Sequence, residues 1–456
     1  MTDATAEGAP DGPPESQETG RFAAFRHGAF VLYFLARVFT TFGSQILSVA
    51  VIWHIYAITK SALYTGLVGL VQFLPLALLV LVTGTAADQF GRRMIMGASI
   101  VLAAACAAAM AIFTALGMIS AVVMLSILVV FGVARAFLGP ASSSLVVSLV
   151  PTRDFANAVT WNSSAWQAAT IVGPAAGGLL LGLGERPFTN WLAGMGQSQV
   201  AGFLDGHGPE IAYTTGFFFM MLGALLVFAI PKPPKAPPRE RPTLSNMLEG
   251  FRFIWKQKII LGAISLDLFA VLMGGVIALL PIYAEDILHL GPEGLGWLRA
   301  APGIGAIAMA AVIAIFPIKD HAGRIMFVCV ALFGLFTVVF GLSTTAWLSI
   351  TALICLGAAD MVSVVVRETL LQLWTPDDVR GRVNAVNSVF VSASNELGEF
   401  RAGTMAHAIG PAAIGAVPAV VIGGFGAIAV AGVWAWIFPT LRNARRLDGK
   451  DVEHPT

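Results

Sequence analysis

Long apolar stretches separated by short polar segments run through most of the chain. A helix that crosses a bilayer core of about 30 Å needs about 20 mostly apolar residues. The pattern therefore predicts an all-α membrane protein with twelve transmembrane helices. The predicted spans are Phe30–Ala57, Ala62–Thr85, Met94–Leu116, Ala121–Val147, Ala158–Leu183, Thr214–Ile230, Ile259–Ala284, Gly294–Phe316, Ile325–Leu342, Trp347–Leu371, Val383–His407 and Ala412–Phe438.

The overall composition agrees with a membrane protein and argues against other classes. Hydrophobic residues make up 57% of the 456 positions and charged residues only 12%, whereas soluble domains carry about 25% charged residues. A net charge of +1 gives no basic face for a nucleic-acid partner. The cysteines Cys106, Cys329 and Cys355 all lie in apolar stretches, so we expect no metal site or disulfide there.

The basic residues predict an orientation, because loops on the cytoplasmic side are enriched in Lys and Arg. With the N-terminus inside, twenty of the 27 basic residues fall in cytoplasmic segments, and only Lys60 and Arg186 lie outside. Both termini are therefore predicted to be cytoplasmic.

A central linker divides the chain into two predicted six-helix bundles, residues 23–230 and 259–440. The linker, residues 231–258, begins rich in proline and continues as Asn246–Lys258, which we expect to form a helix along the membrane surface. The acidic segment 1–22 and the segment 441–456 are predicted to be cytoplasmic tails, the first of them disordered. Segment 1–22 lacks the apolar stretch of a signal peptide.

The two halves also resemble each other in sequence. A shift of 225 residues places Gly132 on Gly357 and Pro151 on Pro376. Such a match predicts pseudo-symmetric halves, as in many transporters, although chance similarity between apolar segments is the alternative.

The charges inside the predicted helices follow a pattern. Predicted helices 3, 6, 9 and 12 contain no Asp, Glu, Lys or Arg, so we expect them at the periphery, and helices 1, 4, 7 and 10 around a central cavity. The interior charges lie on the other helices: Arg37, Arg135, Asp267, Arg299, Asp360, Glu396, Glu399 and Arg401.

Two charge pairs are candidates for the transport pathway. Arg135 and Asp360 occupy equivalent positions in the two halves and predict either a pair that binds substrate or proton, or a structural ion pair. Asp267 and Arg37 lie at similar depth, so that Asp267 is either a proton carrier or a packing carboxylate.

Glu396 and Glu399 form a third candidate. They are three residues apart and share a helix face. Two close carboxylates in a low dielectric do not both ionise easily, which suits proton exchange. Alternatively they pair with Arg401 or Arg299. The predicted substrate and proton pathway therefore comprises Arg37, Arg135, Asp267, Asp360, Glu396 and Glu399.

The loop between predicted helices 2 and 3 has the composition of a conformational latch. Gly84 allows close helix contact and Gly91 permits a tight turn. Asp88 can accept hydrogen bonds from a helix N-terminus, while Arg92 and Arg93 hold the loop on the cytoplasmic side.

Predicted helix 5 contains Gly173, Pro174, Gly177 and Gly178. The proline removes one backbone hydrogen bond and the glycines remove side-chain bulk, so this helix can bend against a neighbour.

Both motifs resemble signatures of the major facilitator superfamily, although Gln89 stands where the loop signature usually has Arg. Helix 5 is similar to the superfamily's antiporter signature. A closer resemblance, to the enterobactin-exporter group, lies in Asp267–Val271, Leu280-Pro281, Gly291–Gly296, Asn395–Arg401 and Phe438–Arg442.

This resemblance implies a monomeric multi-pass transporter of the bacterial inner membrane, working by alternating access without a cofactor. The implied activity is export of a siderophore or an amphipathic drug-like small molecule in exchange for protons. An importer or a (lyso)lipid flippase of the same superfamily is the alternative. The chain has no GxxxxGK[ST], HExxH, CxxC or GxSxG motif, which argues against an ATP-driven pump or an enzyme.

Two further features leave alternatives open. The aromatic residues Tyr33, Phe39, Phe42 and Phe269 would suit flat aromatic ligands if they lined the cavity, and otherwise face lipid or the core. The long outer segment Gly184–Tyr213 is either a cap over the exit or an idle insertion.

Overall fold

The computed structural model describes residues 20–232, 244–318 and 320–444, and the side chains of residues 80–81, 84–89, 244–248 and 377–378 also lie outside the description. These residues are almost entirely helical, without a strand in the described ranges. Within the described ranges, ten helices are long and apolar enough to cross a membrane, or eleven if α5 and the short helix after it form one bent span. The chain is therefore a multi-pass membrane protein.

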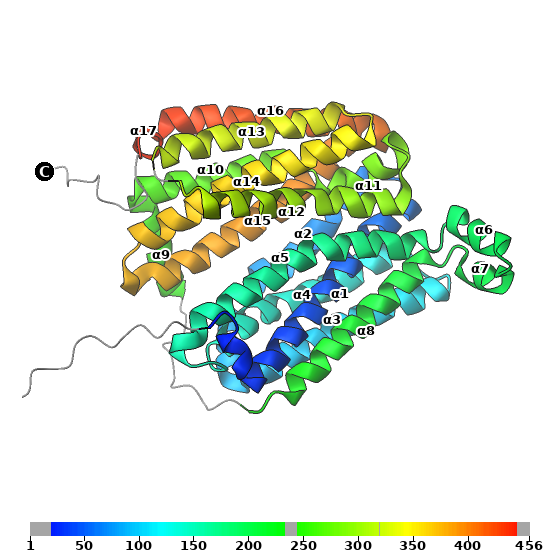
Figure 1. The fold of residues 1–456 in the computed structure, drawn as a ribbon. Coiled ribbons are helices and arrows are strands. Elements are labelled where there is room, and N and C mark those ends of the chain that lie inside the picture. The colour runs from blue at the N-terminus through cyan, green and yellow to red at the C-terminus, as the bar shows by residue number, and fades with distance from the viewer. Residues whose placement is uncertain (1–19, 233–243, 319, 445–456) are drawn as a thin grey trace, which may run out of the picture.

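The helices form two bundles, which lie one above the other in Figure 1. The first contains α1 (Gly28–Thr59), α2 (Ala62–Phe90), α3 (Arg92–Ala115), α4 (Ala121–Val146), α5 (Thr152–Gly182) and α8 (Gly208–Ala229). The second contains α10 (Lys258–Gly274), α12 (Gly291–Ile315), α13 (Ala322–Leu342), α14 (Ala346–Trp374), α15 (Asp377–Ile409) and α16 (Ala412–Ile437).

Short helices mark the two ends of the molecule (Figure 1). We call one the linker end: it carries η1 (Ala23–Arg26), the linker helix α9 (Leu244–Lys256) and α17 (Pro439–Arg442). The other is the hairpin end, where α6 (Arg186–Gly194) and α7 (Ser198–Leu204) project from the first bundle. The predicted outer insertion is thus largely helical, and α8 begins at Gly208, before the predicted Thr214.

Short parts of both predicted tails, residues 20–22 and 441–444, are described by the structure and contact the helix bundles. Phe22 stacks on Trp161 of α5 with ring centroids 5.2 Å apart. The backbone carbonyl of Arg21 accepts hydrogen bonds from Asn157 and Trp161. Leu441 in α17 is fully buried. The remainder of both predicted tails, and residues 233–243 of the linker, lie outside the described residues.

The helices α5 and α15 begin earlier than their apolar stretches predict. Each begins directly after a proline, Pro151 or Pro376, which takes nearly the same backbone angles at the two N-caps. Since these prolines match in the 225-residue shift, the shared helix start supports an internal duplication. The first turns of both helices are polar, so hydropathy alone could not locate their beginnings.

The predicted seventh helix is not continuous. After α10 ends at Gly274 the chain passes through η2 (Ile277–Leu279), α11 (Leu280–Ile282) and the π-helical turn η3 (Tyr283–Ile287). Two adjacent glycines, Gly274 and Gly275, weaken the helix, and Pro281 lacks the N–H that a helix interior requires. Gly275 also lies against the backbone of Gly398, where a Cβ would approach within 3.1 Å.

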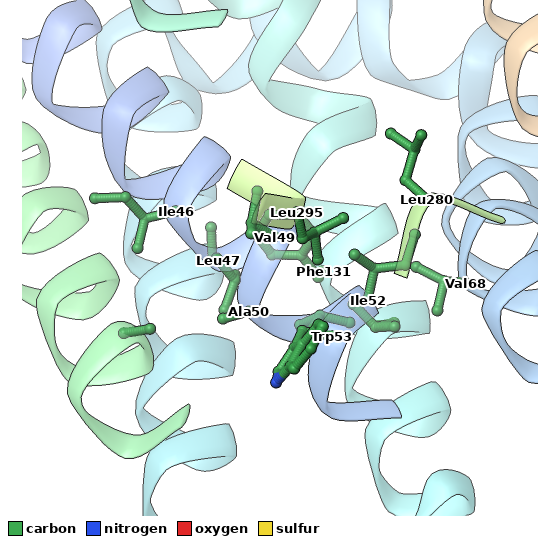
Figure 2. Close-up of a cluster of buried hydrophobic side chains, with 14 of the residues drawn as sticks. Ile46, Leu47, Val49, Ala50, Ile52, Trp53, Val68, Phe131, Leu280 and Leu295 are labelled. Atoms are coloured by element: carbon green, nitrogen blue, oxygen red, sulfur yellow. The ribbon is translucent and has the colours of Figure 1, made fainter. Parts of the chain in front are cut away.

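The largest hydrophobic core joins the two bundles near the hairpin end. Figure 2 shows Leu280 and Leu295 from the second bundle beside Val49, Ile52 and Phe131 from the first. These side chains are buried, so they close this end of the molecule with apolar packing.

Two pairs of glycines bring the backbones of the two bundles into contact, also toward the hairpin end. A Cβ on Gly178 of α5 would lie 2.8 Å from the Cα of Gly296 on α12. A Cβ on Gly403 of α15 would lie 2.7 Å from the Cα of Gly66 on α2. Only residues without side chains allow such close helix contacts.

Candidate functional site

A cavity of ≈ 310 Å³ lies between the bundles. Its lining comes from α1, α2, α4, α5, α12 and α15. Helices 1 and 4 line it as predicted, but the expectation for helices 7 and 10 is wrong, since no described residue of α10 or α14 contributes to the lining. α10 packs against α15 and α16, and α14 packs against α12 and α13, so both stand behind the helices that face the cavity.

The helices α3, α8, α13 and α16, whose predicted spans contain no charge, also contribute no described residue to the cavity. They expose large apolar side chains instead, among them Phe218, Val328 and Phe425. This placement agrees with the predicted periphery.

Two carboxylates of α15, Glu396 and Glu399, line the cavity together. Glu396 Oε1 lies 3.3 Å from Nη1 of Arg135 on α4, and the same guanidinium nitrogen donates to Gln72 Oε1 at 2.9 Å. An ion pair therefore joins the two bundles across the cavity.

A glycine of α2 makes room for both carboxylates. A Cβ on Gly69 would lie 2.9 Å from Glu396 Oε2 and 3.1 Å from Glu399 Oε2. The two oxygens thus converge on one point of the α2 surface. The predicted helix-face relationship between these residues is observed, and the convergence places two acidic groups within reach of one another.

Arg299 of α12 supplies a second guanidinium. Its Nη2 donates to Ser48 Oγ of α1 at 2.8 Å, and it interacts electrostatically with Glu399 and Glu396. Arg37, also in the lining, donates from Nε to Asn162 Oδ1 at 3.5 Å. Three guanidiniums and two carboxylates therefore face one small cavity, whose charge changes when a carboxylate gains or loses a proton.

The predicted pairing of Arg135 with Asp360 is not what the structure contains, because Arg135 contacts Glu396 instead. Asp267 likewise does not pair with Arg37. It forms a buried ion pair with Arg367 of α14, and Asp360 interacts electrostatically with both members of that pair. The sequence analysis overlooked Arg367, although its position within the apolar stretch of predicted helix 10 was a usable signal.

Arg401 does not join the carboxylates either. Its Nε donates to the carbonyl of Leu272 at 2.9 Å and its Nη2 to the carbonyl of Met273. It satisfies backbone acceptors at the end of α10, where the break leaves them without helical partners.

The predicted latch is only partly described. Gly91 adopts a φ of 87° between α2 and α3, a conformation that favours glycine. Arg92 donates to the carbonyl of Ser144 at 3.0 Å and Arg93 to the carbonyl of Ile230. Gly84 and the side chain of Asp88 fall in the segment 84–89, which lies outside the description of side chains.

The glycines of the helix 5 motif are packing positions. Gly173 and Gly177 face Gln45 and Ile46 of α1, while Gly178 makes the contact with α12. The motif therefore lets α5 pack closely against α1 of its own bundle and against α12 of the second bundle.

Sequence reasoning missed two polar contacts across the hairpin end. Lys60 donates to Glu285 and Tyr56 donates to Asp286, so α1 is tied to η3. Glu185 lies nearby, and burial together with the charges of Glu285, Asp205 and Glu293 raises the pKa of its carboxyl. These contacts and the glycine pairs close the cavity toward the hairpin end.

None of the four predicted aromatic residues lines the cavity. Tyr33 is buried and bonds to Ser142, and Phe269 packs on Trp434. Of the two alternatives for these residues, the structure therefore supports lipid-facing or core positions and not a cavity lining. The aromatic residues that do line it are Phe131 and Trp166.

The chain matches the family model described as transmembrane secretion effector over residues 19–433. It is 26% identical over 397 residues to the multidrug efflux pump Tap of Mycobacterium tuberculosis, covering 84% of this chain and 88% of that protein. It is 25% identical over 431 residues to the enterobactin exporter EntS of Citrobacter koseri, covering 92% and 94%.

Solved structures support the same fold. A bacterial homologue of the human lysosomal transporter Spinster, in an inward-facing and unoccupied conformation, superposes with a TM-score of 0.71 at 16% identity, covering 92% of this chain and 98% of that one. A D-xylose–proton symporter superposes with a TM-score of 0.64 at 14% identity, covering 90% and 97%.

Proposed function

The chain belongs to the transmembrane secretion effector family of major facilitator superfamily transporters, and we propose that it exports a siderophore or an amphipathic drug-like small molecule by proton antiport. The observation that carries this proposal is the pair of converging carboxylates, Glu396 and Glu399, facing guanidiniums in a cavity closed at the hairpin end. The names of the relatives Tap and EntS support the direction of transport and the substrate class.

The lining suits an amphipathic substrate. Its volume, ≈ 310 Å³, is at the lower end of the range of about 300–1,000 Å³ for small-molecule pockets. Phe131 and Trp166 offer apolar surface, while Arg37, Arg135 and Arg299 offer donors to oxygen-rich or anionic groups.

Proton exchange follows from the carboxylates. When Glu396 is ionised it holds Arg135 and can also accept a hydrogen bond from a donor group of the substrate, and protonation removes that acceptor. Glu399, beside it, is the second group that titrates in this cycle. Substrate and proton then compete for the same carboxylates, which is the condition for antiport.

Alternating access would use the two bundles, residues 23–230 and 259–440, as bodies that rock about the cavity in the bacterial inner membrane. With the termini cytoplasmic, the hairpin end is the outer side, and the present conformation is closed there. The glycines of α5 form part of that seal. The loop around Gly84, Asp88, Gly91, Arg92 and Arg93 would latch the cytoplasmic side in the opposite state.

The test uses everted membrane vesicles that contain a pH-sensitive dye, energised and then exposed to catecholate siderophores and amphipathic drugs. Alkalinisation of the lumen by a few compounds, abolished in Glu399→Gln but retained in Asp205→Asn, would support proton antiport. Asp205 lies on the outer surface beyond α7 and serves as the matched control. Substrate equilibration without proton movement would refute antiport and favour a facilitator or a lipid flippase, and accumulation in intact cells would favour an importer.

A further inference from the structure

A second group of charges lies behind the cavity, within the second bundle. Arg367 of α14 pairs with Asp267 of α10, and its Nη2 also lies 3.5 Å from Glu368 Oε1. Asp360 interacts electrostatically with Asp267 and Arg367. We call Asp267, Asp360, Arg367 and Glu368 the Arg367 cluster. None of them lines the described cavity.

The cluster has an unbalanced charge. It contains three carboxyl groups and one guanidinium, and both Asp267 and Arg367 are at least 95% buried. Uncompensated charge is costly in such a place. Glu368 is only partly buried, with a side chain 40% accessible, and it accepts a hydrogen bond from Asn387 of α15 at 3.0 Å. The charge that remains to be neutralised therefore falls on Asp267 and Asp360, and one proton is enough to neutralise it.

Arg367 has a donor to spare for a second carboxylate. Among the residues that the structure describes, its Nε has no hydrogen-bond partner, and neither has Oγ of Ser363, although these side chains are only 3% and 2% exposed. Asp360, Ser363 and Arg367 are spaced three and four residues apart, so they follow one face of α14. Arg367 Nε and Ser363 Oγ are therefore unused donors, and Asp360 lies on the same face of α14. Asp360 thus offers Arg367 an alternative partner to Asp267.

We propose that the Arg367 cluster is a second proton-binding site, separate from the substrate cavity, in which Arg367 alternates between Asp267 and Asp360. This rests on the proposed proton antiport. In the present conformation Arg367 holds ionised Asp267, and the carboxyl of Asp360 carries the proton. When Arg367 turns to Asp360, that O–H bond breaks and its proton leaves to water, while Asp267 gains a proton from water. One proton is released and one is bound.

The neighbouring helices connect this site to the cavity. α15 packs against α10 and carries Asn387, which bonds to Glu368, as well as the cavity carboxylates Glu396 and Glu399. Arg401 of α15 also holds the backbone at the end of α10. A change of partner within the cluster therefore acts on the helix that presents the cavity carboxylates. The described helices packed against α10 and α14 carry further charged groups: Glu293 and Arg299 on α12, Arg324 on α13, Arg442 on α17, Glu249, Arg252 and Lys256 on α9, and, besides the residues of α15 already named, Arg380 and Arg382.

Infrared spectroscopy of the purified full-length protein tests the site without relying on transport. We expect a pH-dependent C=O stretch of a protonated buried carboxyl group, shifted by D₂O, in the wild type and in Glu399→Gln. The band should be lost in Asp360→Asn. A band that persists unchanged in Asp360→Asn would overturn the proposal, whatever the transport assays give.

Transport by reconstituted protein tests the role of the site. In Asp360→Asn and in the charge-neutral double variant Asp267→Asn/Arg367→Gln, we expect substrate counterflow to remain, since it needs no net proton movement. Proton-driven accumulation should fall to the level of protein-free liposomes. Full proton coupling in both variants, or loss of counterflow together with coupling in both, would identify the cluster as a static structural ion pair. If the wild type shows the infrared band but moves no protons, antiport fails while the binding site stands.

Discussion

Gly69 gives the sharpest test of the carboxylate geometry. In Gly69→Ala the added methyl would lie 2.9 Å from Glu396 Oε2 and 3.1 Å from Glu399 Oε2. Contact this close forces both carboxylates to move, and the Arg135–Glu396 pair at 3.3 Å moves with them. Overpacking of this kind costs about 1–3 kcal/mol, and the gain in helix propensity offsets about 1 kcal/mol of it.

The effect on stability and the effect on transport should be distinguishable by measurement. The melting temperature in detergent should fall only modestly, because the gain in helix propensity offsets part of the overpacking cost. Proton-coupled transport should fall by about tenfold or more, since a loss of about 1.4 kcal/mol at the site corresponds to tenfold. The control is Gly139→Ala, which also lines the cavity but meets no atom within 4 Å. Wild-type transport by Gly69→Ala would refute the idea that the two carboxylates converge on α2 during the cycle.

Three further predictions concern the seal, the buried pair and the outer acids. In Gly178→Leu the side chain meets Gly296 at 2.8 Å or less, so closure at the hairpin end should be blocked. Cysteines introduced into the cavity should then react faster with reagents added from that side, and an unchanged labelling rate would contradict this. Asp267→Asn/Asp360→Asn leaves buried Arg367 without either of its proposed aspartate partners and should destabilise the protein by about 3–5 kcal/mol, with much of the melting temperature restored by adding Arg367→Gln, whereas equal melting of the double and triple variants would show the pairing to be unimportant. The raised pKa of Glu185 means that its charged form opposes folding. This penalty is absent below the unfolded-state pKa, grows as the pH rises from that value to the folded-state pKa, and is fully present above the latter. Glu185→Gln should therefore stabilise the protein above the folded-state pKa and have little effect in acid, and an equal effect in both ranges would argue against this cause.

Much of the helix arrangement followed from local properties of the sequence. Apolar length located the spans, and the absence of charge from the predicted spans placed α3, α8, α13 and α16 at the periphery. The start of α15 was missed because the polar residues after Pro376 hide a helix that packs between other helices. The break after Gly274 had a local signal in the paired glycines and Pro281.

The charge partners were harder to predict, because they depend on which helices cross. Arg135 and Asp360 are equivalent in sequence and similar in depth, yet one faces the cavity and the other lies behind it. The partner of Arg135 comes from α15, which crosses α2 near Gly69, and no spacing within either helix encodes that crossing. Arg367, in contrast, was visible as a charge within an apolar stretch.

The two halves share glycine and proline residues that set the backbone geometry, but they differ in their charged residues. Pro151 and Pro376 begin corresponding helices. Gly132 and Gly357 bring corresponding helices into contact with backbone carbonyls, those of Gln72 and Pro302. Glycine and proline set the geometry that any pair of rocking bundles needs, so a duplication can keep them in both halves.

The acids that we propose to carry protons, in contrast, all lie in the second bundle, on α10, α14 and α15. The first bundle contributes Arg37 and Arg135 to the cavity. Proton binding in one half can therefore influence substrate binding in the other only through contacts that cross between them. The crossing of α2 with α15, where Gly69 admits both cavity carboxylates and Arg135 holds one of them, is the contact best placed to transmit that coupling.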